Sequence, residues 1–224
     1  MEEQVVIIGN SHFSELIYEH IRQDKNWKVL AFAANEAYIQ EPMLGGIPVV
    51  AVEELEERYI QDEIKLVLAV GYGNMNQTRK KIYEECSKKG FSFMNYIHSS
   101  VLCSQKVEWG SGNIVFPGVS IDSFVKIGSG NIILPHVMVG HDVNVGDFWT
   151  VSGGTRLGGS VKIGNGTFIG MAAVIKDQIT LGTDVFIGAS SYVHKDVKDG
   201  RCVVPPQSKY LNERESVIFK ELYC

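Results

Sequence analysis

His141 and Asp142 are adjacent in the sequence, and Gly159 follows eighteen residues after the histidine. An imidazole titrates near neutral pH, so it can take a proton from a reacting group, and a neighbouring carboxylate can fix its tautomer or raise its basicity. An open backbone N–H at a glycine can stabilise an oxyanion. If the fold brings His141 to Gly159, a proton acceptor and an oxyanion donor share one place. Without chemistry, the same residues would form an ordinary solvated corner.

A period of six residues indicates the fold that would bring them together. Fourteen successive sixth positions are aliphatic, and twelve of them are β-branched. They are Val115, Ile121, Ile127, Ile133, Val139, Val145, Val151, Leu157, Ile163, Ile169, Ile175, Leu181, Ile187 and Val193. This period suits neither an amphipathic helix nor a hairpin sheet, and it predicts a parallel β-helix of hexapeptides with tight corners. Each buried Ile or Val contributes roughly 1.5–3 kcal/mol, so this ladder alone could hold the fold.

The length of one coil decides which residues are neighbours. If three hexads make one coil, residues eighteen apart stack about 4.8 Å apart in neighbouring coils. His141 is therefore expected beside Gly159 on one edge of the prism, with the glycine N–H open. The ladder is loose between Val101 and Gly112, and this stretch is interpreted as the first coil.

Before the ladder, apolar strands alternate with helices. Strands are expected at 4–9, 27–33, 65–71 and 91–95, and helices at 15–21, 52–58 and 78–89. Apolar rather than alternating strands indicate a small Rossmann-like parallel α/β unit. The first loop, Gly9–Ser14, follows a strand and opens a helix, where backbone amides would bind a nucleotide phosphate. The loop lacks a GxGxxG pattern, so a purely structural turn is an equal alternative. Gly71–Asn74 ends a neighbouring strand and could line the same crevice.

Composition argues against several classes of function. The formal net charge is −5, which argues against a nucleic-acid-binding surface. No apolar run approaches transmembrane length, and the N-terminus lacks the basic start of a signal peptide. The four cysteines are scattered, and no pair of histidines has metal-ligand spacing. We therefore expect a cytoplasmic protein with no metal and with no nucleic-acid or membrane partner.

The chain also resembles a known family along nearly its whole length. Besides the hexads, the resemblance rests on Ile8–Ser11, Ala69–Gly71, Arg79–Tyr83 and Asn95–Ser100, and it is most specific at Val139–Asp147. These segments resemble the hexapeptide-repeat acyltransferases, and more closely the bacterial N-acetyltransferases of nucleotide-linked 4-amino-4,6-dideoxy sugars, relatives of the sialic acid O-acetyltransferases. The resemblance implies a left-handed β-helix, a homotrimer, and an active site in the groove between neighbouring prisms, where acetyl-CoA lies as cosubstrate.

The resemblance also implies roles for individual residues. His141 would take a proton from the sugar amine, Asp142 would support it, and the Gly159 N–H would face the thioester oxygen. The implied acetyl-CoA site comprises Thr150, Gly159, Met171 and Ala189, with Met171 and Ala189 expected on the edge that carries His141. The implied nucleotide-sugar site comprises Gly9, Asn10, Ser11, His12, Asn35 and Gly71.

Several positions depart from the family pattern. Thr150 stands where close relatives have a second histidine, and it cannot serve as a base. His12 and Ser14 occupy positions where glycines are usual. Ala33–Asn35 replaces an acidic pair that reads the base and ribose, which leaves the nucleotide base open.

These observations predict three parts and one leading function. The parts are an α/β nucleotide-sugar-binding domain at 1–97, a left-handed β-helix at 98–200, and a tail at 201–224 with a closing helix at 213–222. The expected function is acetyl-CoA-dependent N-acetylation of a UDP-, dTDP- or GDP-linked amino-dideoxy sugar in bacterial surface-glycan synthesis. Two alternatives remain open: O-acetylation of sialic acid or another sugar, and a hexapeptide nucleotide-sugar binder without catalysis.

Overall fold

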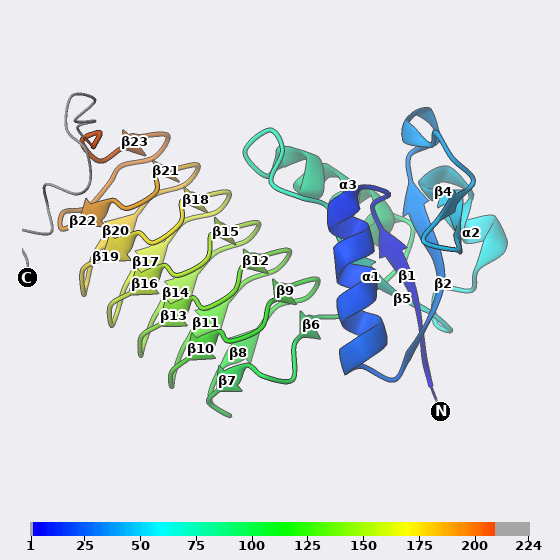
Figure 1. Cartoon of the computed structure of the whole chain (residues 1–224), viewed down its shortest axis with the longest axis horizontal. Coiled ribbons are helices and arrows are strands. Elements are labelled where there is room, and N and C mark those ends of the chain that lie inside the picture. Colours follow the sequence, from blue (N-terminus) through cyan, green and yellow to red (C-terminus); the bar gives the residue numbers. More distant parts are fainter. Residues whose placement is uncertain (1, 209–224) are drawn as a thin grey trace, which may run out of the picture.

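A computed structural model describes residues 2–208, in which an α/β domain precedes a stack of coils (Figure 1). The α/β domain holds a five-stranded sheet in the order β3-β4-β2-β1-β5, in which only the edge strand β3 runs antiparallel to its neighbour. Its elements are β1 (Glu3–Ile8), α1 (His12–Asp24), β2 (Trp27–Ala34), η1 (Glu36–Tyr38), β3 (Met43–Leu44), β4 (Ile47–Ala51), η2 (Val52–Glu54), α2 (Leu55–Arg58), β5 (Lys65–Leu68) and α3 (Gln77–Lys88). The predicted parallel α/β unit is confirmed.

One predicted strand of this domain is wrong. The stretch 91–95 forms only a single bridge between Leu66 and Phe93. Phe91 and Phe93 are buried in the core beside α3, and the chain then leaves the sheet to begin the β-helix at Tyr96. Burial of two aromatic rings therefore produced a strand-like pattern without a strand.

The coils form three parallel sheets, as is typical of a left-handed β-helix. Sheet 1 has seven strands: β6 (Tyr96–Ile97), β9 (Ile114–Val115), β12 (Ile132–Ile133), β15 (Thr150–Val151), β18 (Phe168–Ile169), β21 (Phe186–Ile187) and β23 (Cys202–Val203). Sheet 2 has six: β7 (Leu102–Cys103), β10 (Ser120–Ile121), β13 (Met138–Val139), β16 (Arg156–Leu157), β19 (Val174–Ile175) and β22 (Tyr192–Val193). Sheet 3 has five: β8 (Glu108–Trp109), β11 (Lys126–Ile127), β14 (Asn144–Val145), β17 (Lys162–Ile163) and β20 (Thr180–Leu181).

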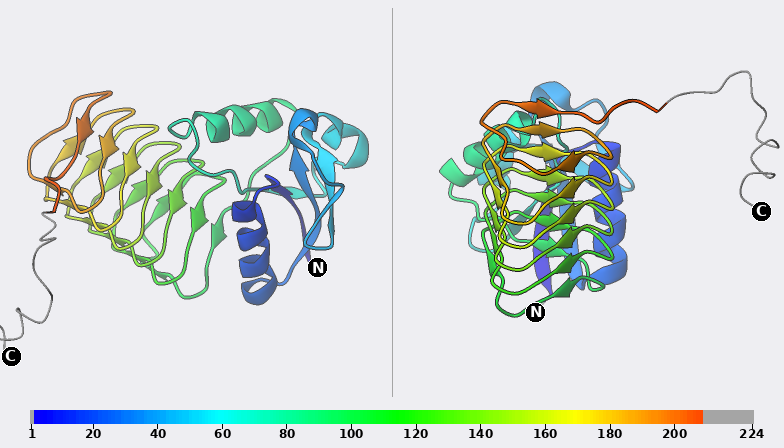
Figure 2. Two further views of the ribbon diagram at one scale, coloured as in Figure 1. Left: turned by 45° about the horizontal axis from the view of Figure 1, so that its top comes forward. Right: turned by 90° about the vertical axis from the view of Figure 1, so that its left-hand side faces the viewer.

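The ladder residues explain why these two-residue strands are stable. Every ladder residue has an exposed fraction of 4% or less, and together they form one core inside the prism. Strand partners lie eighteen residues apart, as in Val139 with Leu157, so the predicted coil length is confirmed. The right-hand view in Figure 2 looks along this stack of coils. The pairing extends from Tyr96 to Val203, beyond both expected boundaries of the β-helix at 98 and 200.

The α/β domain covers the outer face of sheet 1. The outward side chains of its first four strands, Tyr96, Ile114, Ile132 and Thr150, are buried there. Tyr96, Ile114 and Ile132 share a core with α1 and one face of the five-stranded sheet, and α1 and α3 both lie against the first coils (Figure 2). The predicted closing helix at 213–222 lies outside the described residues. None of the helices between residues 2 and 208 is both long and apolar enough to cross a membrane.

Candidate active site

His141 and Asp142 stand on the edge between sheets 2 and 3, directly after β13. Asp142 has a left-handed backbone (φ 56°), a conformation that Asp tolerates better than most residues, and this turns its carboxylate back toward the ring. The distance from His141 Nδ1 to Asp142 Oδ2 is 2.8 Å, and both side chains are more than half exposed. A carboxylate only accepts, so Nδ1 carries the proton and Nε2 is left as the acceptor. The hydrogen bond to Asp142 raises the pKa of His141, while partial desolvation acts in the opposite direction.

Gly159 lies beside this imidazole, one coil further along the stack. A Cβ placed on Gly159 would lie 2.6 Å from His141 Nε2, so only a glycine leaves room for the ring. The expectation that the Gly159 N–H is open is wrong, because it donates to Asp177 Oδ1 at 3.1 Å. Asp177 stands eighteen residues after Gly159 on the same edge, and that spacing was the signal that could have revealed it.

Met171 and Ala189 do not share the edge of His141. They follow β18 and β21 of sheet 1, and they therefore occupy the edge between sheets 1 and 2. The backbone of this edge is linked from coil to coil, as in the hydrogen bond from Ser190 N to Met171 O at 2.8 Å. Met171 is 30 residues from His141, which is not a multiple of the eighteen-residue coil, so the same-edge expectation was wrong.

Thr150 is buried and cannot meet a ligand in this structure. Its hydroxyl donates to Asn76 Oδ1 at 2.7 Å and accepts from Arg79 Nη2 at 2.9 Å, and its exposed fraction is 0%. Thr150 points outward from sheet 1, where the α/β domain covers it. The expected contact with acetyl-CoA is therefore wrong.

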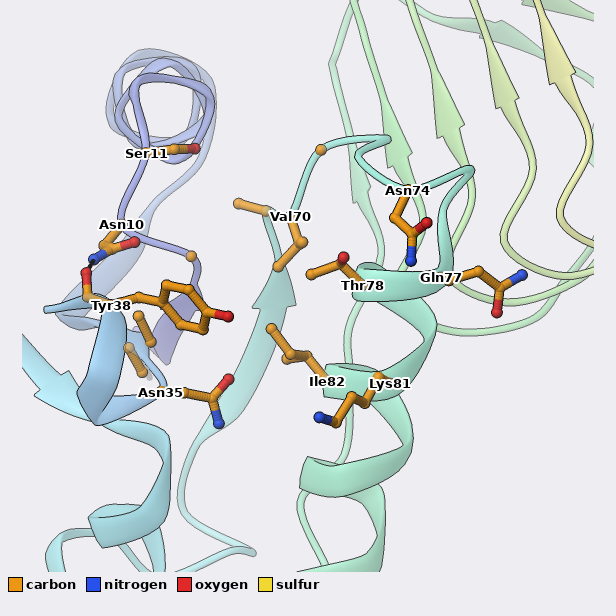
Figure 3. Close-up of a pocket in the computed structure, with 15 residues that line it drawn as sticks. Asn10, Ser11, Asn35, Tyr38, Val70, Asn74, Gln77, Thr78, Lys81 and Ile82 are labelled. Carbon is orange, nitrogen blue, oxygen red and sulfur yellow. Dashed lines mark hydrogen bonds between the residues drawn. The ribbon is translucent and has the colours of Figure 1, made fainter.

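A second candidate site is a cleft of about 560 Å³ at the carboxyl edge of the parallel sheet (Figure 3). It is lined by Gly9, Asn10, Ser11, Ala33, Ala34, Asn35, Tyr38, Ala69, Val70, Gly71, Asn74, Gln77, Thr78, Lys81 and Ile82. Five of the six residues expected to bind the nucleotide sugar are in this set. His12 lies outside it: its side chain is 93% exposed and faces Glu15 at 3.5 Å.

The first wall of the cleft depends on a glycine and on a buried serine. Gly9 has φ 126°, and a Cβ there would lie 2.5 Å from the carbonyl oxygen of Ala69. Ser14 donates to that same oxygen at 2.9 Å and thus ties α1 to the end of β5. Ser11 begins α1 with a capping box, so the helix N-terminus faces the cleft.

Asn35 lies at the far end of the cleft with its amide orientation fixed. Its Nδ2 donates to Glu53 Oε1 at 3.1 Å and to Glu85 Oε2 at 3.4 Å, and both are carboxylates that can only accept. Its Oδ1 is therefore the atom offered to a ligand. Burial opposes ionisation of Glu53, but hydrogen bonds from Asn35 and backbone amides outweigh it and lower the pKa of Glu53.

Residues of α3 and η1 complete the cleft and were missed from the sequence. Thr78, Lys81 and Ile82 form the wall opposite Asn35 and Tyr38 (Figure 3). The signal was present: a helix that follows Gly71–Asn74 must place its first turn beside that crevice. Nothing in the sequence indicated Tyr38, which belongs to a short 3-10 turn.

An apolar chamber of about 460 Å³ adjoins this cleft, and Gly71 lines both. Phe13 and Leu16 of α1, Tyr72, and Pro117 and Pro135 of the β-helix are among its lining residues. The chamber therefore runs from the cleft toward the edge between sheets 1 and 2. In residues 2–208, no cluster of three or more His, Cys, Asp or Glu side chains is arranged to hold a metal ion.

Comparisons with known proteins agree with both halves of this architecture. The model of the PglD N-terminal domain matches residues 4–86, and the model of the bacterial transferase hexapeptide (six repeats) matches residues 160–195. The chain is thus similar to the PglD-like hexapeptide-repeat acetyltransferases. No curated protein matches the chain.

Three solved structures are similar to the chain over most of its length. An asparagine-for-histidine variant of perosamine N-acetyltransferase from Caulobacter crescentus, in complex with CoA and GDP-perosamine, is 28% identical, with a TM-score of 0.80 over 90% of this chain and 93% of that chain. The acetyltransferase domain of PglB from Neisseria gonorrhoeae, in complex with acetyl coenzyme A, is 23% identical, with a TM-score of 0.81 over 92% and 97%. WeeI from Acinetobacter baumannii is 23% identical, with a TM-score of 0.78 over 91% and 97%. The last two are similar in fold.

Proposed function

We propose that this protein transfers the acetyl group of acetyl-CoA to the amine of a nucleotide-linked amino-dideoxy sugar. The observation that carries the proposal is the exposed His141–Asp142 pair, whose Nε2 is left as a proton acceptor on a corner beside Gly159. The 28% identical perosamine N-acetyltransferase, solved with CoA and GDP-perosamine, supports the substrate class.

In this proposal the cleft holds the nucleotide. The diphosphate lies at the N-terminus of α1, beside Gly9 and Ser11, where backbone amides and the helix dipole favour negative charge. The exposed ring of Tyr38 is available to stack on the base, and Asn35 Oδ1 accepts a hydrogen bond from a base N–H or a ribose hydroxyl. The sugar then extends past Gly71 into the apolar chamber.

The chemical step uses His141 as the general base. The sugar amine attacks the thioester carbonyl, its proton passes to His141 Nε2, the new C–N bond forms and the C–S bond breaks. The departing thiolate takes the proton back from the imidazolium. Asp142 keeps Nδ1 protonated and stabilises the positive ring. The Gly159 N–H can serve the thioester oxygen only when Asp177 releases it.

A homotrimer is part of the proposal. Four of the six outward residues of sheet 2, Leu102, Met138, Val174 and Tyr192, are apolar and exposed, and Ser120 and Arg156 lie between them. The outward residues of sheet 3 are polar, as in Lys126. A largely apolar exposed face favours contact with another copy. Three copies with sheet 2 turned toward a common axis bring the edge between sheets 1 and 2 of one copy to the edge between sheets 2 and 3 of the next.

That arrangement brings the separate sites together. In one chain, the α/β domain covers sheet 1, and His141 stands on the opposite edge of the prism. The chamber opens toward the edge that carries Pro135, Met171 and Ala189. A neighbour's His141 would meet the sugar there, and Met171 and Ala189 would contact acetyl-CoA bound between the two copies.

The catalytic role is tested by a CoA-release assay across a panel of nucleotide amino sugars. His141→Ala should lower the rate by about 10²–10⁴-fold. Near-normal turnover in this variant would reject His141 as the base. Thermal shifts with UDP, dTDP and GDP separate this function from O-acetylation of a free sugar, which needs no nucleotide.

Shared active sites are tested by mixing two inactive variants. Gly71→Phe should block the cleft without backbone strain, because a Cβ at Gly71 meets nothing within 4 Å. Refolding it together with His141→Ala at a one-to-one ratio should restore about a quarter of the wild-type rate, because a random quarter of interfaces then pairs an intact cleft with an intact histidine. No recovery in stable mixed oligomers would mean that each chain uses its own histidine.

A further inference from the structure

Arg79 of α3 is a fully buried cation, and among residues 2–208 no carboxylate accepts a hydrogen bond from its guanidinium. Its guanidinium donates to Gly130 O (2.7 Å), Gly71 O (3.0 Å), Asn76 Oδ1 (3.0 Å), Phe148 O (3.1 Å), Trp149 O (3.2 Å) and Thr150 Oγ1 (2.9 Å). All six acceptors are neutral, and burial lowers the pKa of Arg79 to about 9. A buried charge without an ionic partner lowers the stability of the fold. Packing between the α/β domain and the β-helix therefore does not by itself explain why an arginine occupies this position.

The segment that Arg79 holds has an unusual backbone. Between Gly71 and α3, three successive residues, Asn74, Met75 and Asn76, have left-handed φ angles of 51°, 48° and 67°. Non-glycine residues visit this region singly and persist there only where the surroundings impose it. Arg79 binds both ends of this segment, at Gly71 O and at Asn76 Oδ1.

Asn76 fixes the same segment to the β-helix. Its side chain is buried, and its Nδ2 donates to Gly166 O at 2.8 Å while its Oδ1 accepts from Arg79 and from Thr150. Arg79, Asn76 and Thr150 therefore form one closed network that reaches from the α/β domain to the coils. Thr150, which was expected at the acetyl-CoA site, belongs to this network.

The held segment faces the ligand on two sides. Gly71 and Asn74 line the cleft, and Gly71 and Tyr72 line the apolar chamber. Arg79 lines neither, so it reaches a ligand only through the segment. We infer that Arg79 is a positioning residue, which holds residues 71–76 in the conformation that binds the nucleotide-linked sugar. This inference rests on the proposed function of the cleft.

The test is Arg79→Lys, which keeps a positive charge but cannot span acceptors on the segment and on the coils with one planar fork. We expect the KM for the nucleotide sugar and the Kd for the matching nucleoside diphosphate to rise about ten- to hundredfold, because displacements of about 1 Å at a site have effects of that size. The KM for acetyl-CoA should stay within about twofold. A general loss of stability would not raise one KM selectively in protein that is still folded.

Tyr83→Phe is the matched control. It lies one turn further along α3 and removes the contact from Tyr83 Oη to Ser111 Oγ (2.7 Å) at the same junction, without touching residues 71–76. Its affinity for nucleotide should remain that of the wild type. Hydrogen exchange provides a ligand-free measurement: Arg79→Lys should speed exchange at the amides of Asn76 and Gln77, which bond to Tyr72 O and Asn74 O.

The outcomes separate the two proposals. If the wild type binds UDP, dTDP or GDP and folded Arg79→Lys binds it equally well, the positioning role is refuted and the proposed function stands. An equal loss of affinity in Tyr83→Phe, or an equal rise in the KM for acetyl-CoA, also refutes it, because the junction as a whole would then be responsible. A wild type that binds no nucleotide overturns the proposed function and this inference with it.

Discussion

Gly159→Ala is predicted to lower activity strongly while changing stability little. The new Cβ would lie 2.6 Å from His141 Nε2 and 2.7 Å from Cε1, whereas ordinary contacts begin near 3.4 Å. The ring must therefore move by roughly 1 Å, and it is free to move because its side chain is exposed. Alanine should fit the backbone without strain, because Gly159 lacks a positive φ. The equivalent corner position of the next coil carries Asp177, which has a Cβ.

The expected result follows from that displacement. Moving a catalytic base by about 1 Å costs on the order of 10²-fold in rate, so kcat/KM in the CoA-release assay should fall by about that factor. The Tm should change by only about 1–2 °C, as expected when an exposed side chain adjusts.

A double variant identifies the cause of the loss. If Gly159→Ala acts by displacing the imidazole, it should have no further effect in the His141→Ala background, because the displaced group is already absent. A wild-type rate in Gly159→Ala would refute the geometric argument. So would multiplying losses in the double variant, since they would assign Gly159 a function independent of the ring.

Three further predictions concern the base, the cleft and the assembly. Asp142→Asn removes the hydrogen-bonded charge that raises the pKa of His141, so the pKa should fall and the acidic limb of the pH–rate profile should move to lower pH; an unmoved limb contradicts this. Asn35→Asp places a carboxylate against Glu53 and Glu85, so titrations should show weaker nucleotide binding and melts a lower Tm, and unchanged values would show that the amide orientation does not matter. Val174→Glu should reduce a trimer to monomers in sedimentation, while Thr180→Glu on sheet 3 should not, and an intact Val174→Glu trimer would exclude sheet 2 as the interface.

The β-helix was predictable because each position of a hexad faces either the core or the solvent. Every sixth residue from Val115 to Val193 is aliphatic, which indicates the core at each of these positions. The α/β domain was predictable for a similar reason, since β1 and β5 are apolar runs closed by turns. The stretch 91–95 failed because two phenylalanines bury themselves equally well as a loop against α3.

In the candidate site, contacts that follow from the coil spacing could be predicted, whereas contacts with segments distant in the sequence could not. The eighteen-residue coil correctly predicts that His141 lies beside Gly159, and the same arithmetic, applied consistently, would have placed Met171 on another edge and Asp177 at the Gly159 amide. Thr150 is different. Its phase correctly points it outward from sheet 1, but an outward residue is exposed or buried according to what covers the sheet.

Thr150 is covered by Asn76 and Arg79, which lie more than seventy residues earlier in the chain. No acidic residue at a helical spacing from Arg79 indicates in the sequence that this arginine is buried. Arg79 looks like one of several basic residues on an amphipathic helix, and only the docking of α3 on the coils turns it inward. A repeat fold makes contacts within the repeat readable, because neighbours recur at a fixed spacing. Contacts between the repeat and a separate domain have no such spacing. The residues that join cleft to β-helix therefore had to come from the structure, and they are the ones on which binding of the sugar is proposed to depend.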